Sequence, residues 1–217
     1  MDIFVIFVFI MLSVSKNKYF FFLSVFILII GGCGEKTSSL SSLSNDSVIL
    51  AFGDSLTYGY NASRRESYPA KLEDLTGLRV INAGVSGEIS GQGLKRLPKV
   101  LDESHPQLMI LCHGGNDLLR KMDLKEMELN IRSMIQLSLD RGIPVILLGV
   151  PKPGIFLSSF DMYEKIANSM DVIFIEDLIS DILRSKSLKS DSIHPNKKGY
   201  NVMAEGIYSL LLDKGAI

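Results

Sequence analysis

Short apolar segments alternate with amphipathic segments along most of the chain after residue 47. The apolar segments are rich in β-branched residues and cover residues 48–52, 78–82, 107–112, 143–150 and 171–175. This length and composition are typical of buried β-strands. Because helix-like segments separate them, the pattern predicts an α/β fold with a five-stranded parallel sheet covered by helices on both faces.

Two of the amphipathic segments have a clear helical period. The longer covers residues 123–142, and Gly142 ends it. Apolar residues recur there mostly at spacings of three or four: Leu124, Met127, Ile131, Met134, Ile135 and Leu139. The other follows Pro195, with an inward face of Val202, Met203, Ile207, Leu210 and Leu211. No internal repeat is present, so residues 47–217 are predicted to form a single domain.

Two further apolar segments, residues 3–14 and 19–30, precede this domain. A membrane-spanning helix needs roughly 20 apolar residues, so neither segment spans a bilayer comfortably. The second follows Lys16 and Lys18, which is typical of a secretory signal peptide. Residues 1–10 hold an acidic residue and no basic one, so Met11 is an alternative start of translation.

The residues Ile30-Gly31-Gly32-Cys33 follow the second apolar segment. They resemble the lipobox of bacterial lipoproteins, in which the cysteine is lipidated and becomes the new N-terminus. We therefore predict a signal peptide over 1–32 and a lipidated Cys33 with a Ser-rich tether over 33–46. The 13 residues after Cys33 would reach about 45 Å when extended. The predicted location is the bacterial cell envelope, periplasmic or at the outer membrane in a Gram-negative host. A plain membrane anchor or a cleaved signal with an incidental cysteine is the alternative.

Charge and cysteine content narrow the functional classes. The formal net charge is -1, and no Lys/Arg-rich stripe occurs, which argues against a nucleic-acid partner. Cys112 is the one cysteine inside the predicted domain, so an internal disulfide is impossible, and its place at the end of an apolar segment predicts burial. No Cys/His cluster has metal-ligand spacing, so a metalloenzyme is not expected, and the reaction predicted below needs no cofactor. We expect a monomer.

Four polar or glycine-rich groups follow predicted strands or precede the last helix. They are Gly53-Asp54-Ser55-Leu56, the loop Asn82 to Gly87, Gly114-Gly115-Asn116-Asp117 and Asp191-Ser192-Ile193-His194-Pro195. Ligands of open parallel sheets bind outside the carboxyl ends of the strands. The four groups are therefore expected to share one rim, which favours Ser55 as a nucleophile over a simple turn residue.

A nucleophilic serine needs a base, and the chain has three histidines. His105 precedes Pro106 at the opposite end of the sheet and is expected on the surface. His113 could line the rim, but no carboxylate is placed to orient it except Asp117, which is predicted to cap the following turn. His194 has Asp191 three residues earlier, a spacing that can join both side chains. A carboxylate on the far ring nitrogen fixes the tautomer that a serine hydrolase requires. The alternative is a polar loop that caps the last helix.

An ester hydrolase also needs donors to the developing oxyanion. The backbone N–H groups of Ser55 and Gly84 and the side-chain amide of Asn116 could supply three. Gly84 lacks a Cβ and lets the backbone come close, although a strand-end glycine is more often a turn residue. Asn116 after two glycines could likewise be a left-handed turn residue.

The four groups match, in order, the signature blocks of the SGNH hydrolases, also called GDSL esterases/lipases. The resemblance covers residues 48 to about 212. The segments SGEISGQGLKRLP and HGGNDLLR resemble the bacterial periplasmic thioesterase, arylesterase and lysophospholipase subgroup. The resemblance implies a flavodoxin-like three-layer α/β/α sandwich. It also implies Ser55 as nucleophile, Gly84 and Asn116 as oxyanion donors, His194 as base and Asp191 as its partner. His113 departs from the family, where an apolar residue is usual, and predicts a more polar rim near Asn116.

Other enzyme classes fit less well. An α/β-hydrolase would have Gly-x-Ser-x-Gly, whereas Thr57 occupies the last position here. A nucleotide-binding module would need a phosphate loop, and no such pattern occurs. We therefore predict a lipid-anchored serine esterase for acyl substrates such as lysophospholipids, aryl esters or acyl thioesters. The alternatives are a carbohydrate O-deacetylase for envelope glycans and a non-catalytic binding lipoprotein, whose expected mark would be a lost Ser, Asn or His.

The substrate preference is tied to residues 149–160, which follow the fourth predicted strand. Ile155, Phe156 and Leu157 form an apolar triplet in this segment. They either line an acyl groove at the rim or pack against the sheet.

Overall fold

The computed structural model describes residues 40–152 and 158–217. The predicted signal peptide and Cys33 lie outside the described residues, as do Ile155, Phe156 and Leu157. Within the part of the chain that is described, no helix is long and apolar enough to cross a membrane.

Five parallel strands form a single sheet in the order β2-β1-β3-β4-β5. They are β1 (Val48–Gly53), β2 (Arg79–Gly84), β3 (Leu108–Cys112), β4 (Val145–Leu148) and β5 (Ile173–Ile175). Each lies within two residues of a segment predicted from the sequence, so the strand prediction is confirmed. The strand order reverses at β1, whose two neighbours are β2 and β3, and ligands of such sheets bind at this point.

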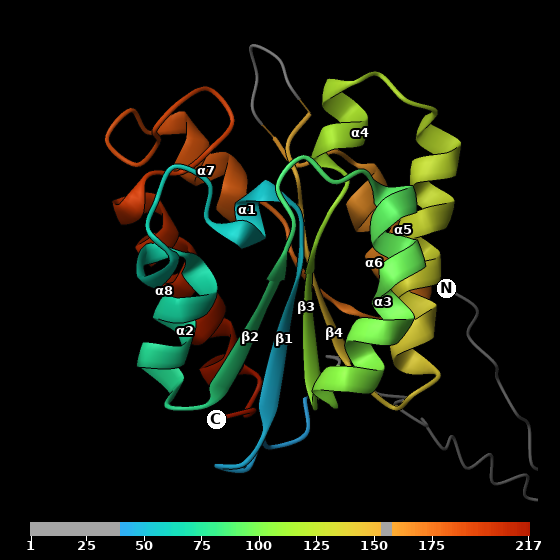
Figure 1. The fold of residues 1–217 in the computed structure, drawn as a ribbon, viewed down its shortest axis with the longest axis vertical. Helices are drawn as coiled ribbons and strands as arrows, with labels where there is room; N and C mark the ends of the chain where they lie inside the picture. The colour runs from blue at the N-terminus through green and yellow to red at the C-terminus, as the bar shows by residue number, and fades with distance from the viewer. Residues whose placement is uncertain (1–39, 153–157) are drawn as a thin grey trace, which may run out of the picture. The chain divides into compact units, whose positions relative to one another are not determined.

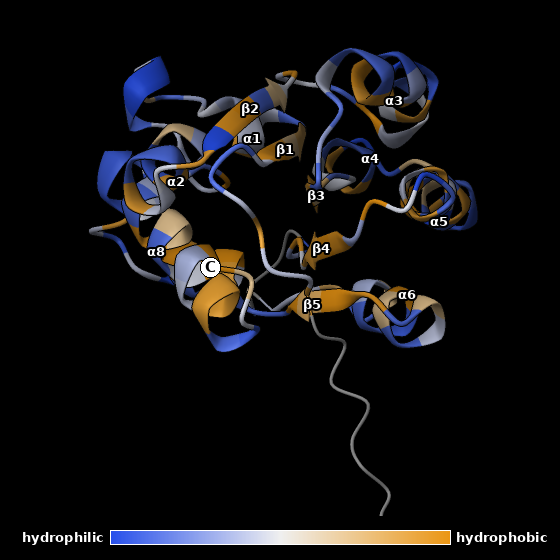
Figure 2. Ribbon diagram, turned by 90° about the horizontal axis from the view of Figure 1, so that it is seen from below, coloured by the Kyte–Doolittle hydropathy of each residue, from blue (hydrophilic) through white to orange (hydrophobic). Residues whose placement is uncertain are grey.

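Helices cover both faces of the sheet, which confirms the three-layer α/β/α prediction (Figures 1 and 2). One face carries α2 and α8, which pack on each other, and the other carries α3, α5 and α6. The helices are α1 (Ser55–Tyr58), α2 (Tyr68–Thr76), α3 (Ser90–Ser104), α4 (Gly115–Leu119), α5 (Leu124–Leu139), α6 (Met162–Met170), α7 (Leu178–Arg184) and α8 (Lys197–Asp213), with a 3-10 turn at Arg64–Glu66.

The core is centred on β1 and β3, whose apolar side chains meet helices on both faces. Every residue of β3 from Leu108 to Cys112 is fully buried, as are Ile49 to Phe52 of β1. Figure 2 shows the strands as hydrophobic ribbons between two amphipathic layers. The predicted burial of Cys112 is confirmed.

The helical periods predicted the inward faces of α5 and α8 with one exception. Leu124 is 40% exposed, because it is the first residue of α5, just after Asp123 whose side chain caps the helix. The other predicted α5 residues are buried or half-buried, and Gly142 adopts a left-handed φ of 71° after the helix. His105 is exposed at the end of α3, as predicted.

The domain begins earlier than the sequence predicted. Leu40 is buried, and the backbone N–H of Leu43 donates to the Ala216 carbonyl at 2.7 Å. The boundary at residue 47 is therefore wrong, because these leucines give the Ser-rich segment apolar groups to bury. Leu40 and the residues after it therefore belong to the domain and not to the predicted tether.

Candidate active site

Ser55 is the first residue of α1, directly after the carboxyl end of β1. A Cβ at Gly53 would collide with the Cys112 carbonyl of the neighbouring strand, so only glycine allows this close approach. Asp54 is buried, and its side chain accepts a hydrogen bond from the Leu56 N–H at 3.1 Å, which caps α1. The strand and the cap together present Ser55 at the rim of the sheet.

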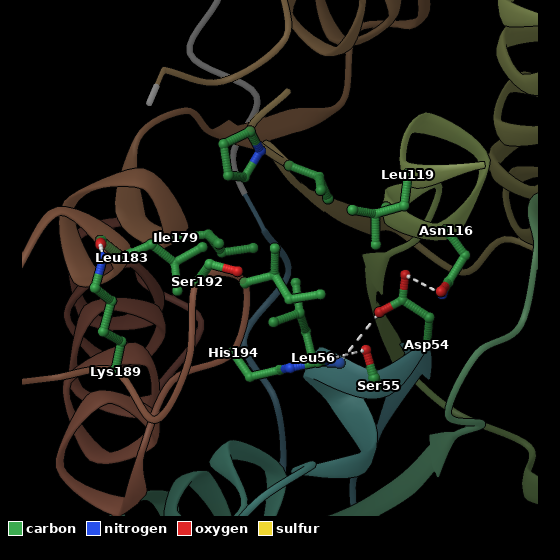
Figure 3. A pocket seen from close by; sticks show the side chains of 14 residues that line it. Asp54, Ser55, Leu56, Asn116, Leu119, Ile179, Leu183, Lys189, Ser192 and His194 are labelled. Carbon is green, nitrogen blue, oxygen red and sulfur yellow. Dashed lines mark hydrogen bonds between the residues drawn. The ribbon is translucent and has the colours of Figure 1, made fainter. Parts of the chain in front are cut away.

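Ser55, His194 and Asp191 form a continuous chain of hydrogen bonds. His194 Nε2 lies 3.0 Å from Ser55 Oγ, as Figure 3 shows, and His194 Nδ1 lies 2.8 Å from Asp191 Oδ2. The Asp191 Oδ1 atom accepts from the backbone N–H groups of Ile193 and His194, each at 2.8 Å. The predicted base thus lies within hydrogen-bond distance of both the predicted nucleophile and the predicted orienting acid.

The carboxyl group of Asp191 is held in its ionised form. Partial burial raises its pKa, but hydrogen bonds from the Ile193 N–H and from His194 together lower it by more. The pKa of Asp191 therefore lies below its ordinary value. An ionised Asp191 accepts a hydrogen bond from the Nδ1–H group of His194. The Nε2 atom is then left to accept the proton of Ser55 Oγ.

Gly84, predicted as an oxyanion donor, has its N–H committed elsewhere. That group donates to Asn82 Oδ1 at 3.0 Å, and one backbone N–H has one proton. A Cβ at this position would collide with the backbone of Tyr58 and Thr57. The prediction for Gly84 is therefore corrected: the glycine is needed so that β2 can pack against α1.

Asn116 lies beside Ser55, near the start of α4. Its side-chain N–H₂ donates to the Glu88 carbonyl at 3.0 Å and makes a longer contact of 3.4 Å with Asp54 Oδ2 (Figure 3). Burial raises the pKa of Asp54 above its ordinary value. The 3.4 Å contact is weak, so a stronger acceptor in the pocket can take over that N–H.

A pocket of about 450 Å³ opens next to these groups. Ser55, Asn116 and His194 lie at one end, and Lys189 and Ser192 add polar groups (Figure 3). The remaining wall is mostly apolar and includes Leu56, Leu119, Val150, Ile179, Leu183 and Ile193. Among residues 40–152 and 158–217, no group of three or more His, Cys, Asp or Glu side chains could hold a metal ion.

Comparison with known proteins assigns this arrangement to a family. The sequence model of the GDSL-like lipase/acylhydrolase family matches residues 51–202. The chain belongs to this family. An arylesterase of Vibrio mimicus is 31% identical over 72% of this chain and 84% of its own. The thioesterase 1/protease 1/lysophospholipase L1 of Escherichia coli K12 is 30% identical over 72% of this chain and 79% of its own.

Solved structures agree with the family assignment. The psychrotrophic esterase EstA of Pseudoalteromonas superposes with a TM-score of 0.71 at 26% identity, over 77% of this chain and 98% of its own. This GDSL/SGNH hydrolase is therefore an ester-hydrolysing enzyme with the family's α/β fold.

His113 of this GDSL hydrolase does not line the rim, contrary to the prediction. Its side chain is fully buried, and Nε2 lies 3.1 Å from Glu88 Oε2. Asp117 is not its partner and does not cap the following turn. Instead, it accepts hydrogen bonds from the backbone and side chain of Ser90 at the start of α3.

Sequence reasoning missed Glu88 and Arg96, which support the loop after β2. Arg96 Nε and Nη2 lie 2.7 Å from the two carboxylate oxygens of Glu88, and Nη2 also donates to the carbonyls of Gly53 and Ala83. Burial raises the pKa of Glu88, but His113 and Arg96 lower it more, so the net shift is downward. The available signal in the sequence was an acidic residue next to Gly87 and an arginine eight residues later, inside α3, and this signal is weak.

Proposed function

We propose that the enzyme cleaves carboxylic esters through an acyl-enzyme formed on Ser55. His194 accepts the Ser55 proton while Oγ attacks the ester carbonyl carbon, and Asp191 stabilises the imidazolium. His194 then gives the proton to the leaving group, and the C–O or C–S bond breaks. A water molecule, deprotonated by His194, attacks the acyl-enzyme and releases the acid and free Ser55. The unbroken hydrogen-bond chain from Ser55 to Asp191 supports this proposal.

Reaction with an organophosphonate that modifies nucleophilic serines tests the proposal. We expect one adduct on Ser55, located by mass spectrometry of the digested protein. An adduct on another serine, or none, would contradict the assignment. All groups of the mechanism come from one chain, so a monomer is proposed to suffice.

The tetrahedral oxyanion is proposed to receive hydrogen bonds from the Ser55 N–H, the Asn116 side chain and the Gly87 N–H. Gly87 replaces Gly84 because its N–H has no acceptor among the described residues. It also precedes Glu88, whose carbonyl accepts from Asn116. Gly87 has a left-handed φ of 78°, a conformation that favours glycine.

The apolar wall of the pocket is proposed to bind the acyl chain of the substrate. Leu119, Val150, Ile179 and Leu183 give it a lining that a small closed acetyl pocket would not need. This assignment depends on described residues, unlike the earlier prediction for Ile155, Phe156 and Leu157. It favours acyl-lipid, aryl or thioester substrates over acetylated glycans.

Lengthening the acyl group of p-nitrophenyl esters from acetyl to hexanoyl is expected to raise kcat/KM at least tenfold. Each buried methylene contributes roughly 0.8 kcal/mol, or about fourfold in binding, and this gain must carry through to the transition state. Steady-state kinetics over the ester series measures the effect.

Leu119→Ala should reduce the ratio of hexanoyl to acetyl kcat/KM severalfold. Leu119 is 42% exposed, so the substitution leaves the core intact. Leu129→Ala is the matched control, because Leu129 is 64% exposed and is not part of the pocket wall. A maximum at acetyl that Leu119→Ala leaves unchanged would reject the acyl groove and favour the O-deacetylase alternative.

We also propose that Cys33 carries a lipid that anchors the enzyme in the cell envelope. The support is the Ile30-Gly31-Gly32-Cys33 sequence after the apolar segment. In a bacterial host, metabolic labelling with an alkynyl fatty acid is expected to mark the wild type and Cys112→Ala, but not Cys33→Ala. Cys112 is fully buried inside the domain and serves as the control cysteine. An unlabelled wild type would contradict the anchor.

A further inference from the structure

Asn61 lies three residues beyond α1 and has an unusual backbone conformation. Its φ is 64°, in the left-handed region that non-glycine residues rarely adopt. Asparagine tolerates this region better than most residues, but glycine would adopt it with less strain. The sequence thus keeps an asparagine side chain where the backbone alone favours glycine.

The Asn61 side chain reaches the acid of the proposed triad. Its Nδ2 donates to Asp191 Oδ2 at 2.9 Å and to Ser190 Oγ at 3.1 Å. The Oδ2 atom is also the acceptor for His194 Nδ1 at 2.8 Å. Among the described residues, Asn61 is the one side chain from outside the 189–195 loop that hydrogen-bonds to Asp191.

The neighbouring residue fixes the backbone from which Asn61 reaches Asp191. The Tyr60 ring lies against the His194 ring, with centroids 4.6 Å apart and an interplanar angle of 40°. The Tyr60 carbonyl accepts a hydrogen bond from the Tyr200 hydroxyl of α8 at 3.0 Å. Segment 60–61, which follows the helix that begins at Ser55, therefore contacts both His194 and Asp191.

We propose that Asn61 is a positioning residue that holds Asp191 and the loop carrying His194 in register with Ser55. The proposal depends on the roles given above to Ser55, His194 and Asp191. The Asp191 side chain is 39% exposed, so water competes for its oxygens. A neutral donor on Oδ2 keeps the carboxylate turned toward His194 Nδ1 without adding a charge. Without it, the carboxylate rotates into solvent more often, and fewer molecules have His194 in the reactive tautomer and orientation.

Asn61→Gly separates this role from a structural one, because it removes the amide and relieves the left-handed strain. We expect kcat for p-nitrophenyl butyrate to fall about three- to tenfold, with KM within twofold of wild type and Tm equal or higher. Asp171→Gly is the matched control: Asp171 is also exposed and left-handed, with φ 52°, at the end of α6. It should leave kcat unchanged.

Asn61→Asp supplies a second, independent readout. It keeps the shape of the side chain but places a carboxylate beside Asp191, so kcat should fall further than in Asn61→Gly. High salt should narrow the difference between the two variants, because salt screens charges at exposed sites. A difference that salt does not change would contradict the electrostatic part of the proposal.

Wild-type kcat in Asn61→Gly would overturn the proposal, and so would a loss of kcat accompanied by a lower Tm. These outcomes are distinguishable from failure of the proposed mechanism. If Ser55→Ala is inactive while Asn61→Gly has wild-type kcat, the mechanism stands and Asn61 has no positioning role. If Ser55→Ala is active, the mechanism itself is wrong.

Discussion

Ser55→Ala is expected to lower kcat for p-nitrophenyl butyrate by about 10⁴- to 10⁶-fold, and His194→Ala by a similar factor. Without Oγ no acyl-enzyme can form, and without the imidazole the serine proton has no acceptor. The two residues act as one unit, joined by the 3.0 Å contact between Nε2 and Oγ. The double variant should therefore be hardly slower than either single variant. The residual rate would come from the oxyanion donors and from substrate binding.

His105→Ala is the matched control for His194→Ala. His105 is exposed at the end of α3, away from Ser55, so its removal should leave kcat unchanged. Circular dichroism and Tm would show that the inactive variants are folded. A folded Ser55→Ala enzyme with kcat within tenfold of wild type would contradict the acyl-enzyme mechanism.

The features predicted correctly from the sequence depend on local patterns. Strand β3 is a continuous apolar segment because both of its faces are buried, and α5 shows its buried face through spacings of three and four. Asp191 and His194 are three residues apart, so one loop brings them together. Ser55 follows a buried strand, and the parallel sheet delivers it to the same rim.

The features that were missed depend on contacts between distant segments. Glu88 and His113 are separated by 25 residues, and no spacing rule pairs them. The ring of His113 fits because Gly93 of α3 has no side chain, since a Cβ there would collide with Nε2. Asn61 and Asp191 are 130 residues apart. Pairings of this kind require the packed fold.

The error at Gly84 has a different physical origin. Gly84 ends β2 and Gly87 follows three residues later, and sequence alone does not reveal where their N–H groups point. The Asn82 side chain decides it by accepting the Gly84 N–H. The loop then continues to Glu88, whose carboxylate binds Arg96. The Arg96 guanidinium also donates to the carbonyls of Gly53 and Ala83, near the carboxyl ends of β1 and β2. The Asn116 side chain donates to the Glu88 carbonyl, which keeps Asn116 close to the adjacent Gly87.

Asn116→Ala is expected to lower kcat by roughly 10²- to 10³-fold, because it removes one of three proposed oxyanion donors. The effect is smaller than that of Ser55→Ala because the acyl-enzyme can still form. In the free enzyme one Asn116 N–H makes only a 3.4 Å contact with Asp54. That N–H can form a shorter hydrogen bond with the oxyanion than with Asp54. Its hydrogen bond is therefore stronger in the transition state than in the ground state. Accordingly kcat and kcat/KM should fall together, with KM nearly unchanged.

Asn116→Asp sharpens this test, because it keeps the side-chain shape but replaces the donor with a carboxylate. The new charge would face both the oxyanion and Asp54, so kcat should fall further than in Asn116→Ala. Leu129→Ala, on the exposed face of α5, again serves as the unaffected control. Steady-state kinetics of all three variants on one ester gives the comparison. If Asn116→Ala raises KM and leaves kcat within threefold of wild type, Asn116 binds the substrate in its ground state and is not an oxyanion donor.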